Sequence, residues 1–247
     1  MAAYAKTDTG RARRANQDFI FASCEPVGPL PNLFVLADGM GGHRAGDFAS
    51  RYFVEEMVKY IQSQNGDDVV KVLETAVQDV NGRLYRLSGE KEELGGMGTT
   101  CVLAVAKDGT LHVGNVGDSR LYVLQGRLRQ VTKDHSYVEE LVALGRMSRD
   151  SEEYHRQKNI ITRAIGTDDT VKIDFFEETL DEGAYFVLCS DGLSNMVGDE
   201  EIEGVALSEG TLEEKAEELV TKANQNGGYD NISVILGQVL PAEVKTC

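Results

Sequence analysis

The chain has 247 residues, enough for one large folded unit with a substantial buried core. Its 25 lysines and arginines are outnumbered by 41 aspartates and glutamates, and the net charge of −16 would repel nucleic acid and an anionic membrane surface. The sequence shows neither a signal-peptide pattern nor an apolar run near the roughly 20 residues that cross a bilayer. We therefore expect a soluble cytoplasmic protein without nucleic-acid or membrane partners.

Short runs rich in β-branched and aromatic residues predict strands, and patterns with apolar residues three and four apart predict helices. The expected strands are 18–23, 32–37, 99–106, 110–117, 119–124, 171–180, 184–190 and 231–239. The expected helices are 53–61, 69–80, 138–144, 199–208 and 211–225. No linker composition or repeat interrupts the chain, so we expect a single domain over residues 1–247.

Two hairpin turns and the apolar strand runs suggest how the strands are arranged. Lys107-Asp108-Gly109-Thr110 is a strong hairpin signal and Gln125-Gly126-Arg127 closes another pair, so an antiparallel meander is expected over residues 99–131. Continuous apolar strands are typical of sheets that are covered on both faces. We predict an α+β fold, a four-layer α-β-β-α sandwich in which two antiparallel sheets pack together with helices outside.

Aspartates occupy several of the predicted strand boundaries: Asp18, Asp38, Asp118, Asp191 and Asp230. Each one alone is most simply a turn residue whose side chain caps its own backbone. Strand ends and strand starts can nevertheless share one edge of antiparallel sheets, so the five can converge. Converging carboxylates repel one another unless cations lie between them, and Mg²⁺ and Mn²⁺ take oxygen ligands of this kind.

Six motifs occur in a fixed order along almost the whole chain. They are R-x-x-x-Q-D at 13–18, VLADGMGGH at 35–43, GTT at 98–100, GNVGDSR at 114–120, LCSDGLS at 188–194 and GYDNISVIL at 228–236. The series resembles the PPM-type, or type 2C, metal-dependent protein serine/threonine phosphatases, and in particular their compact bacterial branch.

The resemblance implies hydrolysis of phosphoserine and phosphothreonine in proteins by a metal-activated water at a binuclear Mg²⁺ or Mn²⁺ centre, with a weaker third ion. It implies phosphoproteins as partners, a serine/threonine kinase among them, and a role in reversing bacterial kinase signalling. A monomer is expected.

The resemblance also assigns metal ligands residue by residue. Asp38 would bridge two ions, and Gly39 would bind one of them through its carbonyl. Asp191 and Asp230 would each hold an ion from the side. Asp118 matches the aspartate of the weaker third site. The glycines beside Asp38 then have a reason, because a bare loop lets a carboxylate and a carbonyl reach the same ions.

Other positions are expected to support the reaction. Gln17 and Asp18 would lie behind the ligands and steady bound water, and Arg13 would bind phosphate bidentately. Gln17 stands where many eukaryotic members have glutamate, and Met40 where they have histidine, which leaves the acid for the leaving group open. His43 is a candidate for that acid, with a structural role as its alternative.

A polar, charged stretch at about 133–167 corresponds to the flap beside the active site of the family. We expect a mobile lid that shapes phosphoprotein docking, where Arg146, Arg149 and Arg156 are candidates to meet an acidic phosphopeptide. His112, inside a strand pattern, is interpreted as a packed histidine.

Two other functions remain open, namely a small-molecule phosphatase with the same metal centre and a non-catalytic phosphoprotein-binding module. A nucleotide-binding enzyme is disfavoured, because no G-x-x-x-x-G-K-[ST] motif occurs.

Overall fold

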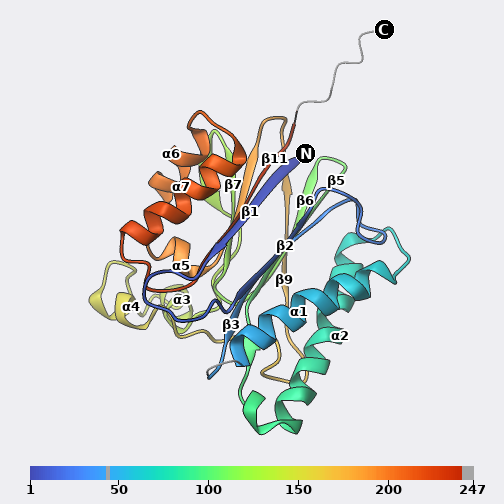
Figure 1. Cartoon of the computed structure of the whole chain (residues 1–247). Helices are drawn as coiled ribbons and strands as arrows, with labels where there is room; N and C mark the ends of the chain where they lie inside the picture. The colour runs from blue at the N-terminus through green and yellow to red at the C-terminus, as the bar shows by residue number, and fades with distance from the viewer. Residues whose placement is uncertain (43–44, 241–247) are drawn as a thin grey trace.

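Two antiparallel sheets lie face to face in the computed structural model, which describes residues 1–42 and 45–240 (Figure 1). The first sheet has the order β1 (Ala2–Asp8), β11 (Ile232–Gln238), β10 (Tyr185–Cys189), β7 (Arg120–Gln125) and β8 (Arg127–Gln130). The second has the order β2 (Asp18–Ser23), β3 (Leu33–Met40), β5 (Cys101–Lys107), β6 (Thr110–Val116) and β9 (Asp174–Thr179), and the short β4 (Gly98–Thr99) pairs with β3.

Helices cover the outer face of each sheet. The second sheet carries α1 (Ala45–Gln62) and α2 (Val69–Glu90), and the first carries α6 (Asp199–Leu207) and α7 (Leu212–Gln225) (Figure 1). The shorter α3 (Tyr137–Ala143), α4 (Glu152–Gln157), α5 (Asp191–Ser194) and the 3₁₀ turn η1 (Glu92–Leu94) lie in the connections. No helix within the described residues has both the length and the apolar character needed to cross a membrane.

Three apolar layers explain why the strand runs are continuous. Along β3, Leu33, Val35 and Ala37 pack under α1 and α2, while Phe34 and Leu36 alternate with them and face the other sheet. Each side of the strand is therefore buried, as the period of two requires. The predicted four-layer α-β-β-α architecture is confirmed.

The predicted meander over residues 99–131 is wrong at its centre. Both hairpins form, β5 with β6 and β7 with β8, and Asp108 and Gly109 have the positive φ values of 52° and 77° that a tight hairpin turn needs. However, β6 and β7 belong to different sheets, so the chain crosses from one sheet to the other at Gly117. The apolar pattern reports burial and carries no information about which sheet a strand joins.

Some elements were missed by the sequence patterns. Strand β1 pairs along its whole length with β11, but its sequence AAYAKTD is poor in the β-branched and aromatic residues that mark strands. Helices α4 and α5 have six and four residues, which is too short for a helical period to appear.

Candidate metal centre

The strand boundaries bring the predicted residues together at one end of the two sheets. Asp18 and Asp38 are directly opposite each other in the β2–β3 pair. Asp191 opens α5 two residues beyond the end of β10, and Asp230 lies two residues before the start of the neighbouring strand β11. Asp118 follows β6 at the crossing between the sheets.

One cavity of about 270 Å³ collects most of these residues. Its lining includes the predicted residues Arg13, Gln17, Asp38, Gly39, Asp118, Asp191 and Asp230. Asp18 lies behind it, only 5% exposed, with Oδ2 accepting a 2.8 Å hydrogen bond from the Ser190 hydroxyl. His43, the candidate acid, lies outside the described residues.

Backbone packing explains the glycine that follows Asp38. The Gly39 N–H donates to the Gln17 carbonyl at 3.0 Å. A Cβ at Gly39 would lie 2.0 Å from the carbonyl oxygen of Gly46, at the start of α1. Only glycine therefore allows the loop, the helix and the Gln17 segment to meet here.

Supporting residues that the sequence did not reveal hold Asp38 from the other side. Thr100 Oγ1 accepts a 2.9 Å hydrogen bond from the Asp38 N–H, and Thr99 Oγ1 donates to the Asp38 carbonyl at 2.9 Å. Thr100 Oγ1 also lies 2.7 Å from Ser119 Oγ, so one hydroxyl connects the segments of Asp38 and Asp118. The GTT motif was the available signal, but the motif alone gave no partner.

Burial and mutual repulsion raise the pKa values of the carboxylates in and behind this cavity. Burial, and then the charges of neighbouring aspartates, raise the pKa of Asp38 well above its ordinary value. Burial and Asp191 raise the pKa of Asp118 to about 7, and burial and Asp230 raise that of Asp191 to about 6. Burial also raises the pKa of Asp18 to about 7, against the hydrogen bonds of two serines. Such a cluster is stabilised by any cation placed between its members.

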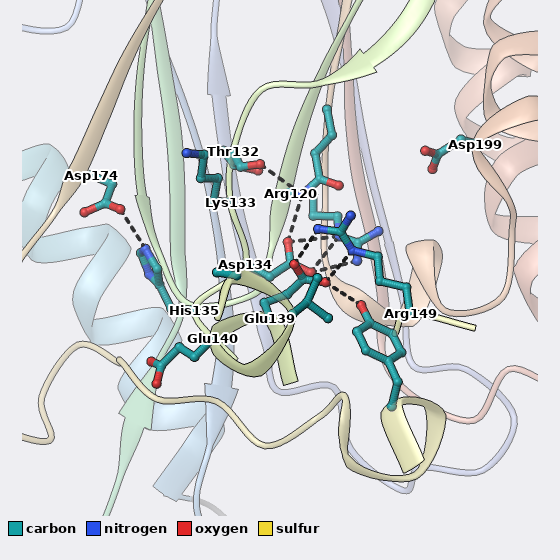
Figure 2. A pocket seen from close by; sticks show the side chains of 14 residues that line it. Arg120, Thr132, Lys133, Asp134, His135, Glu139, Glu140, Arg149, Asp174 and Asp199 are labelled. Atoms are coloured by element: carbon teal, nitrogen blue, oxygen red, sulfur yellow. Dashed lines mark hydrogen bonds and ion pairs between the residues drawn. The ribbon is translucent and has the colours of Figure 1, made fainter. Parts of the chain in front are cut away.

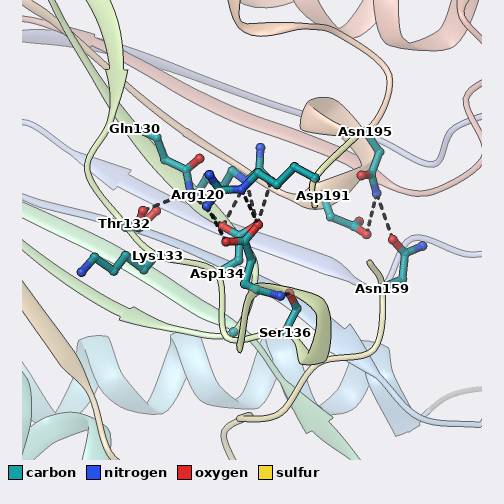
Figure 3. A network of polar contacts seen from close by, with 12 residues as sticks. Arg120, Gln130, Thr132, Lys133, Asp134, Ser136, Asn159, Asp191 and Asn195 are labelled. Carbon is teal, nitrogen blue, oxygen red and sulfur yellow. Dashed lines mark hydrogen bonds and ion pairs between the residues drawn. The ribbon is translucent and has the colours of Figure 1, made fainter. Parts of the chain in front are cut away.

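Carboxylate oxygens without hydrogen-bond partners show that the aspartates fit hard divalent cations. Buried Oδ1 atoms of Asp18 and Asp191 have no hydrogen-bond partner, and the ligand set is made of oxygen, which Mg²⁺ and Mn²⁺ prefer. Across residues 1–42 and 45–240, no three His, Cys, Asp or Glu side chains are already gathered as a finished cage. Asp230 instead accepts from Arg13 at 2.7 Å and Asp191 from Asn195 at 3.0 Å (Figure 3), so these carboxylates would turn toward an ion.

The predicted flap begins with a partly buried ion pair and continues into α3 and α4. Arg120 Nε donates to Oδ1 and Oδ2 of Asp134 at 3.1 and 3.0 Å, and Arg120 Nη2 donates to Oδ2 at 2.7 Å (Figure 3). Nearby, a cavity of about 780 Å³ is lined by Glu139, Arg149 and Tyr154 of the flap, among others (Figure 2). Arg149, a candidate for phosphopeptide binding, makes a bidentate ion pair with Glu139 at 2.9 and 2.6 Å.

Two histidines in the described chain have different surroundings. His112 is partly buried on β6, with Nδ1 3.2 Å from Glu177 Oε1, and it does not line the cavity of the aspartates. His135 is 7% exposed at the start of the flap, and its Nδ1 accepts a 3.0 Å hydrogen bond from the Gly117 N–H, directly before Asp118.

Comparison with known proteins decides the family. The family model described as Protein phosphatase 2C matches residues 10–233, which is most of the chain. The chain belongs to the protein phosphatase 2C family. This membership confirms the predicted family and enzyme class, a protein serine/threonine phosphatase.

Similar proteins support the membership of this phosphatase along almost its whole length. A serine/threonine phosphatase stp of Listeria monocytogenes is 40% identical over 240 residues, covering 94% of this chain and 93% of the relative. The crystal structure of serine/threonine phosphatase Stp1 from Staphylococcus aureus has a TM-score of 0.89 at 36% identity, covering 97% of this chain and 95% of that one.

A further solved structure bears on the metals. The catalytic domain of the serine/threonine protein phosphatase PstP, in complex with two manganese ions, has a TM-score of 0.85 at 33% identity and covers 97% of this phosphatase and 98% of its own chain. The family is metal-dependent, as the sequence motifs implied.

Proposed function

We propose that this chain hydrolyses phosphoserine and phosphothreonine in proteins at a binuclear Mg²⁺ or Mn²⁺ centre with a weaker third ion. The observation that carries the proposal is the convergence of Asp38, Asp118, Asp191 and Asp230 on one cavity that Arg13 also lines. The raised pKa values of Asp118 and Asp191 give the cluster a reason to bind cations.

The ligand roles follow the positions of the side chains. Asp38 would bridge the ion pair, since it lines the cavity and the charges of the other four aspartates all raise its pKa. The Gly39 carbonyl, Asp191 and Asp230 would complete the pair, and Asp118 would hold the third ion. Bound ions would supply a water of lowered pKa and neutralise charge on the phosphoryl oxygens.

The remaining residues bind or orient. Arg13 would hold two phosphoryl oxygens with its planar guanidinium. Asp18 is fixed by Ser190 and leaves one buried oxygen, Oδ1, free to accept a hydrogen bond from water. Gln17 places its carbonyl on the Gly39 N–H and so holds the bare loop. His43 stays a candidate for the acid that protonates the leaving oxygen.

A metal-dependence assay tests the proposal. Hydrolysis of a phosphothreonine peptide should vanish in EDTA and return with Mn²⁺ or Mg²⁺, because the carboxylate cluster cannot activate water alone. Full activity in EDTA would contradict the metal centre.

The same hydrolysis assay with other substrates separates the two alternative functions. Turnover of sugar phosphates that exceeds that of phosphopeptides would favour a small-molecule phosphatase, and peptide binding without turnover would favour a non-catalytic module. The flap, which contributes Asn159 and Ile161 to the cavity wall, is proposed to shape peptide docking. The kinase partner, the cytoplasmic location, the monomeric state and the single domain stay predictions.

A further inference from the structure

The turn that carries Asp118 is held by both backbone groups of its preceding residue. The Gly117 N–H donates to Nδ1 of His135 at 3.0 Å, and the Gly117 carbonyl accepts from the His135 N–H at 2.9 Å. Gly117 has a φ of 104°, and a Cβ there would lie 2.6 Å from Thr100. The backbone of Gly117 is therefore held between Thr100 and His135, and this fixes the turn that carries Asp118.

The hydrogen bonds of the imidazole define its tautomer. Because the Gly117 N–H is a donor, Nδ1 must carry a lone pair, and a neutral ring then has its proton on Nε2. Nε2 lies 3.1 Å from Oδ2 of Asp174 on β9 (Figure 2) and 3.0 Å from Nη1 of Arg163. A guanidinium N–H can only donate, and this Nη1 also donates to Oδ1 of Asp174 at 2.9 Å, so the carboxylate is the acceptor for the Nε2 proton. The ring thus connects a peptide N–H on one side with a carboxylate on the other.

The surroundings of the ring favour its neutral form. Burial lowers the pKa of His135, and the charge of Arg163 lowers it further, while the hydrogen bond that the ring makes to Asp174 raises it. A protonated Nδ1 would lose its acceptor capacity and face the Gly117 N–H with a second donor.

Both ends of the flap are tied to this point. The His135 carbonyl accepts from the Thr162 N–H at 2.8 Å, and Ser136 makes a β-bridge with Ile161. Arg163, at the end of the flap, reaches the same Asp174 as the ring. The flap base and the Asp118 turn consequently share one anchor.

We propose that His135 is a positioning residue, whose neutral Nε2-protonated imidazole holds the Gly117 peptide and so places the Asp118 carboxylate at the weaker metal position. The proposal rests on the proposed function, since Asp118 matters here as the ligand of the third ion. His135 itself touches neither substrate nor ion.

A pair of amide substitutions separates the two ends of the ring. His135→Asn places an oxygen near the position of Nδ1 and can accept from Gly117, whereas His135→Gln reaches toward Asp174 and leaves the buried Gly117 N–H unpaired. In calorimetric Mn²⁺ titrations, His135→Gln should weaken the weaker site about tenfold and leave the tight pair unchanged. His135→Asn should retain most of that affinity, and His112→Gln, on β6 and outside the cavity of the aspartates, should match the parent.

Kinetics provide a second reading of the same variants. The Mn²⁺ concentration for half-maximal phosphopeptide hydrolysis should rise about tenfold in His135→Gln and much less in His135→Asn. Parental Mn²⁺ dependence in His135→Gln would overturn the proposal. Equal losses in both variants would overturn it too, because a merely structural role of the ring would not distinguish its two nitrogens.

A measurement on the unmodified protein keeps the proposal testable if the variants fail to fold. Nitrogen chemical shifts of the His135 ring should show an unprotonated Nδ1 and a protonated Nε2 at pH 7, and a protonated Nδ1 would overturn the proposal. Failure of the parent to bind Mn²⁺ at all would overturn the proposed function as well, whereas a metal-dependent parent with an insensitive His135→Gln refutes only the role of His135.

Discussion

Arg13 cannot bind Asp230 and a substrate phosphate at the same time. Its guanidinium binds Asp230 at 2.7 Å, while the proposed function requires both Asp230 at an ion and Arg13 at phosphate. The Arg13 side chain is half exposed and can change conformation. The contact therefore contributes only as much stability as an ordinary surface ion pair, about 0–1 kcal/mol. An ion at Asp230 would release Arg13 toward the substrate.

Arg13→Ala tests the phosphate contact. Losing a charge-assisted hydrogen bond to substrate should cost about 1.5–3 kcal/mol of transition-state stabilisation, which is a roughly 10- to 150-fold fall in kcat/KM. Mn²⁺ affinity in calorimetry should be unchanged or slightly higher, because a competitor for Asp230 is removed. Arg13→Lys keeps the charge but lacks the planar guanidinium, so its kcat/KM should lie between those of the parent and Arg13→Ala. Kinetics that leave both KM and kcat at parental values would remove Arg13 from the site.

Asp38 and Asp118 should differ in what their loss does to metal binding. Asp38→Ala removes the proposed bridge, so at least one ion of the tight pair and nearly all activity should be lost. Asp118→Ala should keep the tight pair and the fold, yet turn over phosphopeptides much more slowly.

Calorimetric Mn²⁺ titration of both variants beside the parent checks this difference. A tight pair that survives in Asp38→Ala, or disappears in Asp118→Ala, would reverse the two assignments.

At this scale the sequence predicted the charged residues and missed their supports. The aspartates stand in motifs that can be read directly, whereas Thr100, Ser190 and His135 act through hydrogen bonds to residues that are distant in the chain. No sequence pattern indicates which distant residue a hydroxyl or imidazole will bind before the fold is known.

At the scale of elements, local turn chemistry was predictable and the choice of sheet was not. The Asp108-Gly109 hairpin follows from residues that tolerate positive φ. The crossing at Gly117 depends on which apolar face finds which partner, a long-range choice that strand periodicity does not encode. That crossing places Asp118 in the same cavity as Asp38, Asp191 and Asp230 rather than inside a meander.

Gly237 on β11 and Gly204 in α6 give opposite predictions for the same substitution. A Cβ at Gly237 would lie 2.0 Å from the Phe186 ring on the neighbouring β10, so Gly237→Ala should destabilise the fold by about 1–3 kcal/mol through overpacking. A Cβ at Gly204 would meet nothing within 4 Å, so Gly204→Ala should stabilise by about 1 kcal/mol through helix propensity.

Urea unfolding of both variants measures the two free energies. Equal effects of the same sign would mean that the close contact between Gly237 and Phe186 does not determine the packing of this sheet.

At the scale of the whole molecule, the proposed metal ligands come from both halves of the sandwich. Asp38 comes from the sheet under α1 and α2, while Asp191 and Asp230 adjoin β10 and β11 of the other sheet. Ions shared by these carboxylates would bind the folded chain and not the unfolded one, because unfolding separates ligands that are distant in sequence. Metal binding should therefore appear as stability of the entire fold.

Thermal unfolding in EDTA and in Mn²⁺ tests this coupling. At Mn²⁺ concentrations about 100 times the dissociation constant, mass action should add about 2.7 kcal/mol to the free energy of unfolding and raise the Tm in one cooperative transition. Asp38→Asn keeps the shape of the side chain without its charge, so its Tm should respond far less to Mn²⁺. Arg13→Lys, which leaves every proposed ligand in place, should respond like the parent. A parental Tm that is indifferent to Mn²⁺, or a rise of equal size in Asp38→Asn, would show that the ions do not join the two sheets through Asp38.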